Sequence, residues 1–409
     1  MLLNEVELET AQQILINSIE RIQSEVIPLE KALGNVLAED IFAPINVPGF
    51  RKSPLDGFAL NSSDTKGATS QIPSVIKIID EVQAGDTREI DILPAGYGIK
   101  IATGAPLPSG ADVVIKKEDV VYKNNKIFIT KELIKNNNVV SVGSDMKKGE
   151  LILSEGELLT PYHIGVIAAL GLPAVKVYKS PRIAVLSTGN ELKYPGEPLM
   201  FGQIYNSNLY SLIALINSLG GHAYPLGNMQ DNVKEIEKKI LESLDQYDLI
   251  LTTGGASVGD YDLLEKTLIK IGANVLFNRV SIKPGSPVIA GIKNNKLIIG
   301  LSGNPAAALI SFELLVSPVI KKLKGHQDVT LKCLNVELVD GFFKKSPQRR
   351  FLRVHVSYEN GKWVAKQTGN QQSSILRSMV GCNALIDIPR GSDIIPPGST
   401  VKAIFLKKI

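Results

Sequence analysis

Residues 248–253 read Asp-Leu-Ile-Leu-Thr-Thr, and the glycine-rich segment Gly254-Gly-Ala-Ser-Val-Gly259 follows directly. An apolar run of this length that ends in glycines predicts a buried strand whose carboxyl end opens into a loop. A helical pattern then starts at Asp262. The same order of strand, loop and helix recurs on both sides of this stretch, so it decides the fold class.

The repeated pattern covers about 145 residues, roughly the length of one domain. Strands are expected at 183–186, at 222–226, near Phe277 and at 296–300, and helices at 208–219, 231–244, from Asp262 and from Asn304 to about Lys324. Alternating strands and helices predict a parallel sheet covered by helices on both faces.

The flanking regions have a different character. Near the N-terminus, Thr10 and Gln13 match a capping box and predict an amphipathic helix from about Ala11, and a second helix is expected at 29–37. A buried helix is expected at 163–170, before Pro173. Short alternating segments in residues 60–140, and again from Val329 onward, predict two small β-rich domains.

Composition excludes several functional classes. The 409 residues include 45 basic and 41 acidic ones, a net charge of +4 that is too balanced for a nucleic-acid coat. Cys333 and Cys382 form no CxxC motif, and the four histidines form no HExxH motif. The acidic N-terminus does not resemble a secretory signal, and the apolar stretch 164–175 is shorter than the ~20 residues that span a bilayer. A cytoplasmic protein is expected.

Three loops are expected at the carboxyl ends of the strands, where open α/β sheets bind ligands. They are 187–191, 252–259 and 301–305. Their glycines and the adjoining helix starts suit a phosphorylated ligand, although each loop alone is equally an ordinary turn. The turn 281–287 displays Lys283, which could bind an oxyanion or simply lie at the surface.

Carboxylates are spread through the same loops, and their convergence would suit metal-assisted phosphate chemistry. Most aspartates at such positions are turn or cap residues, so both interpretations stay open. The acidic candidates are Asp56, Asp145, Glu191, Asp231, Asp260 and Asp262.

Several segments match one known family in order along nearly the whole chain. Their succession resembles the molybdopterin molybdenumtransferases, the MoeA and gephyrin E-domain family. The matching segments are 51–59, 101–106, 110–114, 142–149, 187–192, 205–208, 254–259, 283–285, 300–305 and 372–379.

The resemblance implies an elongated four-domain protein of the α/β plus β class. Its parts would be an elongated linker domain at 1–45 and 141–178, a β-rich domain at 46–140, an α/β molybdopterin-binding domain at 179–326 resembling MogA and MoaB, and a C-terminal β-barrel at 327–409. It also implies a homodimer that brings Asp56 and Thr103 of one copy to Glu191 and Asp262 of the other.

The resemblance further implies an enzyme that inserts molybdenum from molybdate into adenylylated molybdopterin and releases AMP, with Mg²⁺ as cofactor. An upstream adenylyltransferase and downstream molybdoenzymes would be its protein partners. The positions that match the family's active site are Asp56, Thr103, Asp145, Glu191, Asp231, Asp262 and Lys283.

Physical roles can be assigned to these residues as hypotheses. Glu191, Asp231 and Asp262 are the candidate ligands of Mg²⁺. Lys283 would neutralise charge that develops on an oxyanion. The loop residues Gly254, Gly255 and Ser257 would hold the terminal phosphate of the pterin. The other candidate contacts with substrate are Thr188, Gly189, Arg279, Ser302, Gly303 and Asn304.

Departures from the family pattern affect the expected anion site. Ser286 stands where many members have a lysine, and Ala307 stands where a serine is frequent. Arg350, Ser373 and Ser374 are candidate replacements. Two other readings therefore stay open: a pterin-binding scaffold without turnover, and a paralogue that inserts tungstate. A nucleotide pyrophosphatase or adenylyltransferase on the same α/β domain is disfavoured by the additional domains.

Overall fold

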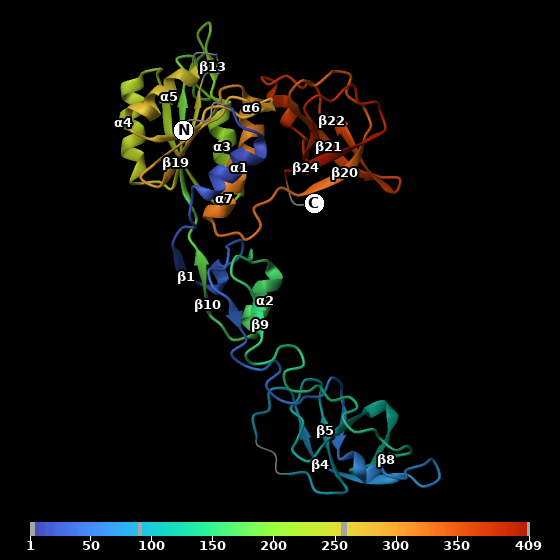
Figure 1. Cartoon of the computed structure of the whole chain (residues 1–409). Helices are drawn as coiled ribbons and strands as arrows, with labels where there is room; N and C mark the ends of the chain where they lie inside the picture. Colours follow the sequence, from blue (N-terminus) through green and yellow to red (C-terminus); the bar gives the residue numbers. More distant parts are fainter. Residues whose placement is uncertain (1–4, 89–91, 255–259, 407–409) are drawn as a thin grey trace. The chain divides into compact units, whose positions relative to one another are not determined.

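The computed structural model describes residues 5–88, 92–254 and 260–406, and the side chains of 260–262 lie outside that description. The chain forms two compact units (Figure 1). The first comprises Met1–Ala38, Glu155–Thr160 and Ala174–Ile409, and the second comprises Glu39–Ser154 and Pro161–Pro173. In the described ranges, no helix is both long and apolar enough to cross a bilayer.

A six-stranded sheet organises the first unit. Its strand order is β14 (His222–Met229), β11 (Arg182–Thr188), β15 (Leu249–Gly254), β19 (Lys296–Ser302), β18 (Ile289–Lys293) and β16 (Asn274–Phe277). The first four strands are parallel, as predicted. β18 is antiparallel to both of its neighbours, β19 and β16. A tight turn at Asn294 and Asn295, both with positive φ, folds β19 back onto β18.

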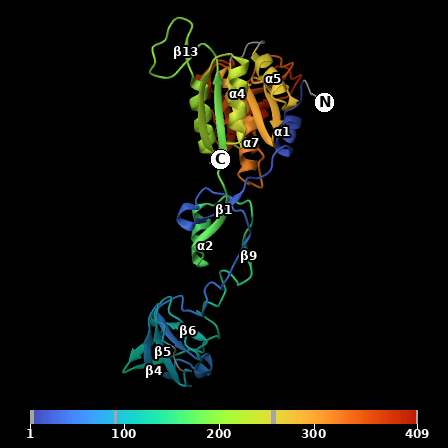
Figure 2. The same ribbon diagram turned by 90° about the vertical axis from the view of Figure 1, so that its left-hand side faces the viewer.

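Helices cover both faces of this sheet, as predicted (Figures 1 and 2). Alternate residues of β11 point to opposite faces, so Val185 packs in one layer and Leu186 in the other. The elements of the first layer are α3 (Ser207–Ser218), α6 (Pro305–Ser311) and α1 (Leu8–Asn17). The second layer consists of α4 (Val233–Leu244) and α5 (Asp260–Lys270).

The long helix expected from Asn304 to Lys324 is present, with a change of pitch in its middle. α6 leads into a π-helical turn, η4 (Phe312–Val316), and then into α7 (Ser317–Leu323). Pro318 has no N–H to continue the regular bonding ladder, which accounts for the wider turn before it. α1 packs against η4 and α7.

Three predictions about helices were wrong. α1 starts at Leu8 rather than Ala11, and no side-chain cap bond forms at Glu7. Residues 29–37 contain only the 3-10 turn η1 (Leu29–Lys31), because β1 (Ser24–Pro28) pairs with β10 (Ala174–Tyr178) and keeps the chain extended. The helix α2 (Pro161–Ala169) exists, but Ile167 is its one buried residue in the described structure.

The C-terminal part of the first unit is an all-β domain, as predicted. Five strands close into a barrel in which β23 pairs back onto β21. Around the barrel the strands are β21 (Arg349–Glu359), β22 (Lys362–Gln367), β20 (Cys333–Leu338), β24 (Ser399–Phe405) and β23 (Ala384–Ile388). The short strand β17 (Ile282–Lys283) pairs parallel with the start of β21.

The second unit contains another six-stranded sheet, which agrees with the β-rich domain expected there. Its strand order is β6 (Val113–Lys116), β3 (Gly57–Leu60), β5 (Tyr97–Ile101), β4 (Ser74–Val82), β8 (Lys126–Ile129) and β7 (Val121–Lys123). Beside it, β2 (Ile41–Phe42) pairs with β9 (Leu151–Leu153).

Candidate active site

A pocket of about 340 Å³ opens at the carboxyl ends of β11, β15 and β19. This is the edge at which a parallel sheet presents its loops to a ligand. Candidate residues from all three predicted loops meet here with Ser374 of the barrel domain. The described lining consists of Thr188, Glu191, Leu192, Ile204, Tyr205, Asn206, Ser207, Asn208, Thr253, Gly254, Gly303, Asn304, Pro305 and Ser374.

A network of uncharged hydrogen bonds forms the floor of the pocket. The Nδ2 group of Asn208 donates to Thr253 Oγ1 at 3.0 Å and to the carbonyl of Gly303 at 2.8 Å. Thr253 Oγ1 donates in turn to the carbonyl of Ser302 at 3.1 Å. The network therefore ties the first turn of α3 to the ends of β15 and β19.

Asn206 supports the same wall from one residue outside α3. Its Oδ1 accepts from the N–H of Leu209 and caps the helix, and its Nδ2 donates to Asn228 Oδ1 at 2.6 Å. Neither Asn206 nor Asn208 was predicted from the sequence as a site residue, although both lie in the matching segment 205–208. An asparagine pair at the start of a helix was the available signal.

Two glycines are required by close approaches at the rim. A side chain at Gly189 would lie 2.7 Å from the Glu191 carboxylate, which folds back over this position. A side chain at Gly254 would overlap the Thr188 hydroxyl. Both glycines were predicted site residues, and the structure shows that they let the polar side chains of their own loops come together.

The N-terminus of α6 is not an open anion site. Its first residue, Pro305, has no N–H. The next two N–H groups, of Ala306 and Ala307, donate to the carbonyl of Ser373 at 3.0 and 3.3 Å. The barrel domain thus caps this helix, and the expectation that the loop 301–305 offers its helix N–H groups to a phosphate was wrong.

Lys283 and Arg350 lie side by side. They are register partners where β17 pairs with β21. The backbone pairing therefore places Lys283 next to the start of β21. The Arg350 guanidinium lies 5.3 Å from the Phe342 ring, and its buried Nε has no partner among the described residues. Burial lowers the pKa of Arg350.

The turn that carries Lys283 packs directly on α6. Gly285 adopts a φ of +95°, and its carbonyl accepts from Ser311 Oγ at 3.1 Å. A side chain at Gly285 would also meet the carbonyl of Ala307. Ala307 is buried between this turn and the Ser373 loop, so α6 joins the cationic turn to the pocket wall.

A buried arginine missed by sequence analysis holds the loop that carries Ser373 and Ser374. Arg353 is fully buried, and its Nη2 donates to the carbonyls of Asn370 and Gln372, each at 3.2 Å. Burial lowers the pKa of its guanidinium. The signal was a charged residue within an otherwise apolar run of strand, at 351–354.

In the second unit, Asp56 and Thr103 lie in direct contact. Asp56 Oδ1 accepts from the Thr103 N–H at 2.9 Å and from its hydroxyl at 2.8 Å. Lys117 Nζ lies 3.5 Å from Asp56 Oδ2. The Thr103 hydrogen bonds, followed by the charge of Lys117, lower the pKa of this exposed carboxylate.

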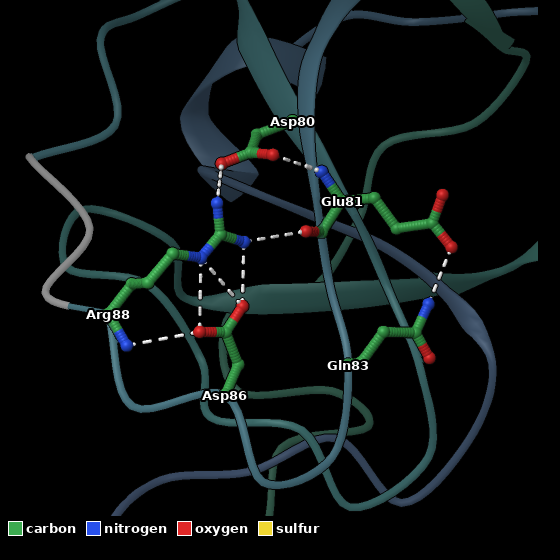
Figure 3. Close-up of polar contacts among 5 residues, drawn as sticks. All are labelled: Asp80, Glu81, Gln83, Asp86 and Arg88. Atoms are coloured by element: carbon green, nitrogen blue, oxygen red, sulfur yellow. Dashed lines mark hydrogen bonds and ion pairs between the residues drawn. The ribbon is translucent and has the colours of Figure 1, made fainter.

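Arg88 orders the loop that follows β4 (Figure 3). The Arg88 guanidinium binds both carboxylate oxygens of Asp86, the carbonyl of Glu81 at 3.1 Å and Asp80 Oδ2 at 3.5 Å. The loop therefore closes back onto β4, whose last residue, Val82, accepts a hydrogen bond from the N–H of Ala102 next to Thr103.

The remaining predicted residues are exposed or fall outside the description. Asp145 and Arg279 are exposed, and Asp231 lies exposed just before α4. Gly255, Ser257 and the side chain of Asp262 lie outside the described residues. Within the described part, no group of three or more His, Cys, Asp or Glu could hold a metal ion.

Known protein families match consecutive parts of the chain. The MoeA N-terminal region (domain I and II) matches residues 6–171. A probable molybdopterin binding domain matches residues 184–322, and the MoeA C-terminal region (domain IV) matches residues 335–406.

Individual proteins match over nearly the full length. The chain is 33% identical to a molybdopterin molybdenumtransferase of Staphylococcus aureus, covering 98% of this chain and 96% of that protein. It is 34% identical to the Bacillus subtilis protein of the same name, covering 94% and 90%. A crystal structure of a molybdopterin biosynthesis MoeA protein from Pyrococcus horikoshii superposes with a TM-score of 0.87 at 32% identity, covering 99% and 100%.

Proposed function

The chain belongs to the MoeA family, and from this premise we propose that it transfers molybdenum from molybdate onto adenylylated molybdopterin and releases AMP. Its curated relatives are named molybdopterin molybdenumtransferases. The chain is accordingly a transferase of molybdenum cofactor biosynthesis.

The proposed reaction rests on one observation: the pocket wall, the Ser373 loop and the Lys283 turn all meet at α6. The pocket wall at Asn304 and Pro305 begins this helix. The carbonyl of Ser373 caps it, and the turn with Lys283 packs on Ala307 and Ser311. Mostly uncharged residues with one carboxylate, Glu191, line the pocket, and the turn with the cation Lys283 packs on the same helix. This combination suits a substrate with a ring at one end and anionic groups at the other.

Lys283 and Arg350 would hold molybdate and the anionic groups of the substrate. Water attacks one phosphorus of the phosphoanhydride and the P–O bond to the bridging oxygen breaks, which gives AMP and the pterin phosphate. The two dithiolene sulfurs bind molybdenum, and one oxo group of molybdate leaves as water with the two thiol protons. Negative charge grows on the departing phosphate, and fixed cations stabilise that charge more than the ground state. Arg353 would act indirectly, by keeping the Ser373 loop against α6.

Magnesium is implied by the family resemblance alone. Glu191 and Asp231 are the two candidate ligands whose side chains are described, and they belong to no cluster that could hold a metal in the described part of the chain. The side chain of the third candidate, Asp262, lies outside the described residues, and no step of the proposed reaction is assigned to the metal.

We further propose that the functional form is a homodimer. The helix α2 has the sequence PYHIGVIAA and almost no charged surface, yet most of it is exposed in the second unit. A helix that is apolar all round is normally covered. A second copy would cover it, and Asp56 and Thr103 of the partner subunit would complete the site.

The direct test is AMP release by the purified protein from adenylylated molybdopterin, with molybdate and tungstate titrated in parallel. Release that depends on molybdate is the expected result, and release that depends on tungstate instead would assign the other metal. Tight pterin binding with no release under either oxyanion would overturn the transferase proposal and establish a scaffold.

A further inference from the structure

Asn208 presents a buried polar atom that the described structure leaves without a partner. Its side chain lines the pocket, and the residue is only 8% exposed. Its Oδ1 atom forms no hydrogen bond with any described residue. A buried acceptor of this kind is costly unless something donates to it.

The orientation of the amide follows from its two neighbours. The Gly303 carbonyl can only accept a hydrogen bond, so the Asn208 atom beside it must be the NH2 group. Thr253 uses its hydroxyl hydrogen on the Ser302 carbonyl, so its oxygen must also accept from Asn208. The two contacts agree, and they leave Oδ1 fixed as an acceptor that cannot turn away without breaking both.

The surroundings in the pocket favour a ligand that donates hydrogen bonds. Glu191 is the charged residue among the described lining residues, and a carboxylate accepts hydrogen bonds. Leu192, Ile204 and Pro305 supply apolar surface suited to a flat ring. One negative charge, together with a buried acceptor that lacks a donor, disfavours a phosphate and favours a heterocycle with N–H groups.

We propose that Asn208 is a specificity-determining residue whose Oδ1 accepts a hydrogen bond from the exocyclic amino group of a substrate heterocycle. This inference rests on the proposed function, which supplies two such rings in one substrate, the pterin and the adenine. Both carry an amino group on a planar ring. The shared chemistry defines the site, and binding experiments can assign the ring.

The test measures the affinity of the full-length protein for matched pairs of rings by calorimetry. AMP is compared with inosine monophosphate, and pterin with lumazine, because a carbonyl oxygen replaces the amino group in the second member of each pair. The carbonyl oxygen of the second ring would lie against Asn208 Oδ1, and two acceptors cannot form a hydrogen bond with each other. The expected loss for the ring that occupies this pocket is roughly tenfold in affinity.

The same pairs are then measured with Asn208→Ala and with Asn217→Ala as the matched control. Asn217 lies at the other end of α3, where its Oδ1 accepts from the N–H of Ala223. The preference for the amino ring should disappear in Asn208→Ala and persist in the control. Because the wild-type comparison uses altered ligands alone, it remains decisive even if Asn208→Ala fails to fold.

The outcomes separate the two proposals. If the wild type binds both members of each pair equally well, or if Asn208→Ala keeps the preference, the role of Asn208 is wrong while the proposed function stands. If none of the four ligands binds, both are wrong. A preference within the AMP pair assigns adenine to this pocket, and one within the pterin pair assigns the pterin.

Discussion

The pocket of the first unit and the Asp56–Thr103 edge of the second hold their polar groups in opposite ways. In the pocket, Asn208 and Thr253 are buried and bonded to backbone carbonyls without any charge of their own. At the edge, an exposed carboxylate is held by one residue and a lysine. Buried neutral networks fix geometry and support the fold, whereas an exposed charge contributes little to stability and is free to act on a substrate.

The largest effect is expected from Asp56→Asn. The amide keeps the shape but removes the charge, so kcat/KM for AMP release should fall by about 100-fold, the scale of losing one charged catalytic group. The thermal midpoint should hardly change, because the side chain is exposed. Asp119→Asn, another exposed carboxylate in the same unit, is the control for charge alone. If Asp56→Asn has activity close to that of the wild type, Asp56 has no catalytic role, and the contrast between the two regions is weaker.

Gly254→Ala tests the other side of the comparison. The added methyl group overlaps the Thr188 hydroxyl, and overpacking of this kind costs about 1–3 kcal/mol of folding stability. Urea unfolding of the variant should show that loss, together with weaker ligand binding in the pocket. The double variant Gly254→Ala with Thr188→Ala should recover most of it, because the overlapping atom is gone. If Thr188→Ala does not restore stability to the Gly254→Ala variant, the strain lies in the backbone.

Much of the fold could be predicted from the sequence, because local patterns specify it. β11, β15 and β19 are apolar runs that end in polar loops, and the positions of these loops place the pocket. The expected helix at 29–37 failed because pairing between β1 and β10 overrode the local pattern. The hydrophobic pattern of 163–170 predicts a helix but does not reveal which elements pack against it, so the exposure of α2 could not be predicted.

The sequence selects single residues of the candidate site but not the contacts between them. Asp56, Thr103 and Lys283 were selected because they match positions of the family's active site, and their roles remain predictions. The orphaned oxygen of Asn208 depends on the two acceptors that fix its amide, and those lie on β15 and just after β19. The capping of α6 by Ser373 and the support of that loop by Arg353 join elements distant in sequence, so neither leaves a local signature.

A smaller effect is expected from Thr103→Ala, measured as the pKa of Asp56 by NMR titration of the substrate-free protein. The Thr103 N–H and hydroxyl stabilise the ionised carboxylate and lower its pKa. Removing the hydroxyl should raise that pKa towards its ordinary value, so the acid limb of the activity profile should move to higher pH. Thr103→Ser keeps both donors and should leave the titration unchanged. An unchanged titration in Thr103→Ala would show that the hydroxyl does not hold the carboxylate in solution.

The smallest effect is expected from Arg88→Ala, which loosens the loop beside Thr103 without touching Asp56. Arg88 closes this loop onto β4 through Asp86 and the carbonyl of Glu81, but its side chain is 57% exposed (Figure 3). Exposed ion pairs are weak, so kcat/KM should fall roughly threefold. Amide hydrogen exchange should become faster at Ala102 and Thr103, while Lys123→Ala, an exposed cation removed elsewhere in the same unit, should leave both measurements unchanged. Faster exchange with full activity would show that the exposed Asp56–Thr103 edge tolerates motion, and this would sharpen its contrast with the buried pocket. Unchanged exchange would show that the Arg88 cluster does not order the Thr103 turn.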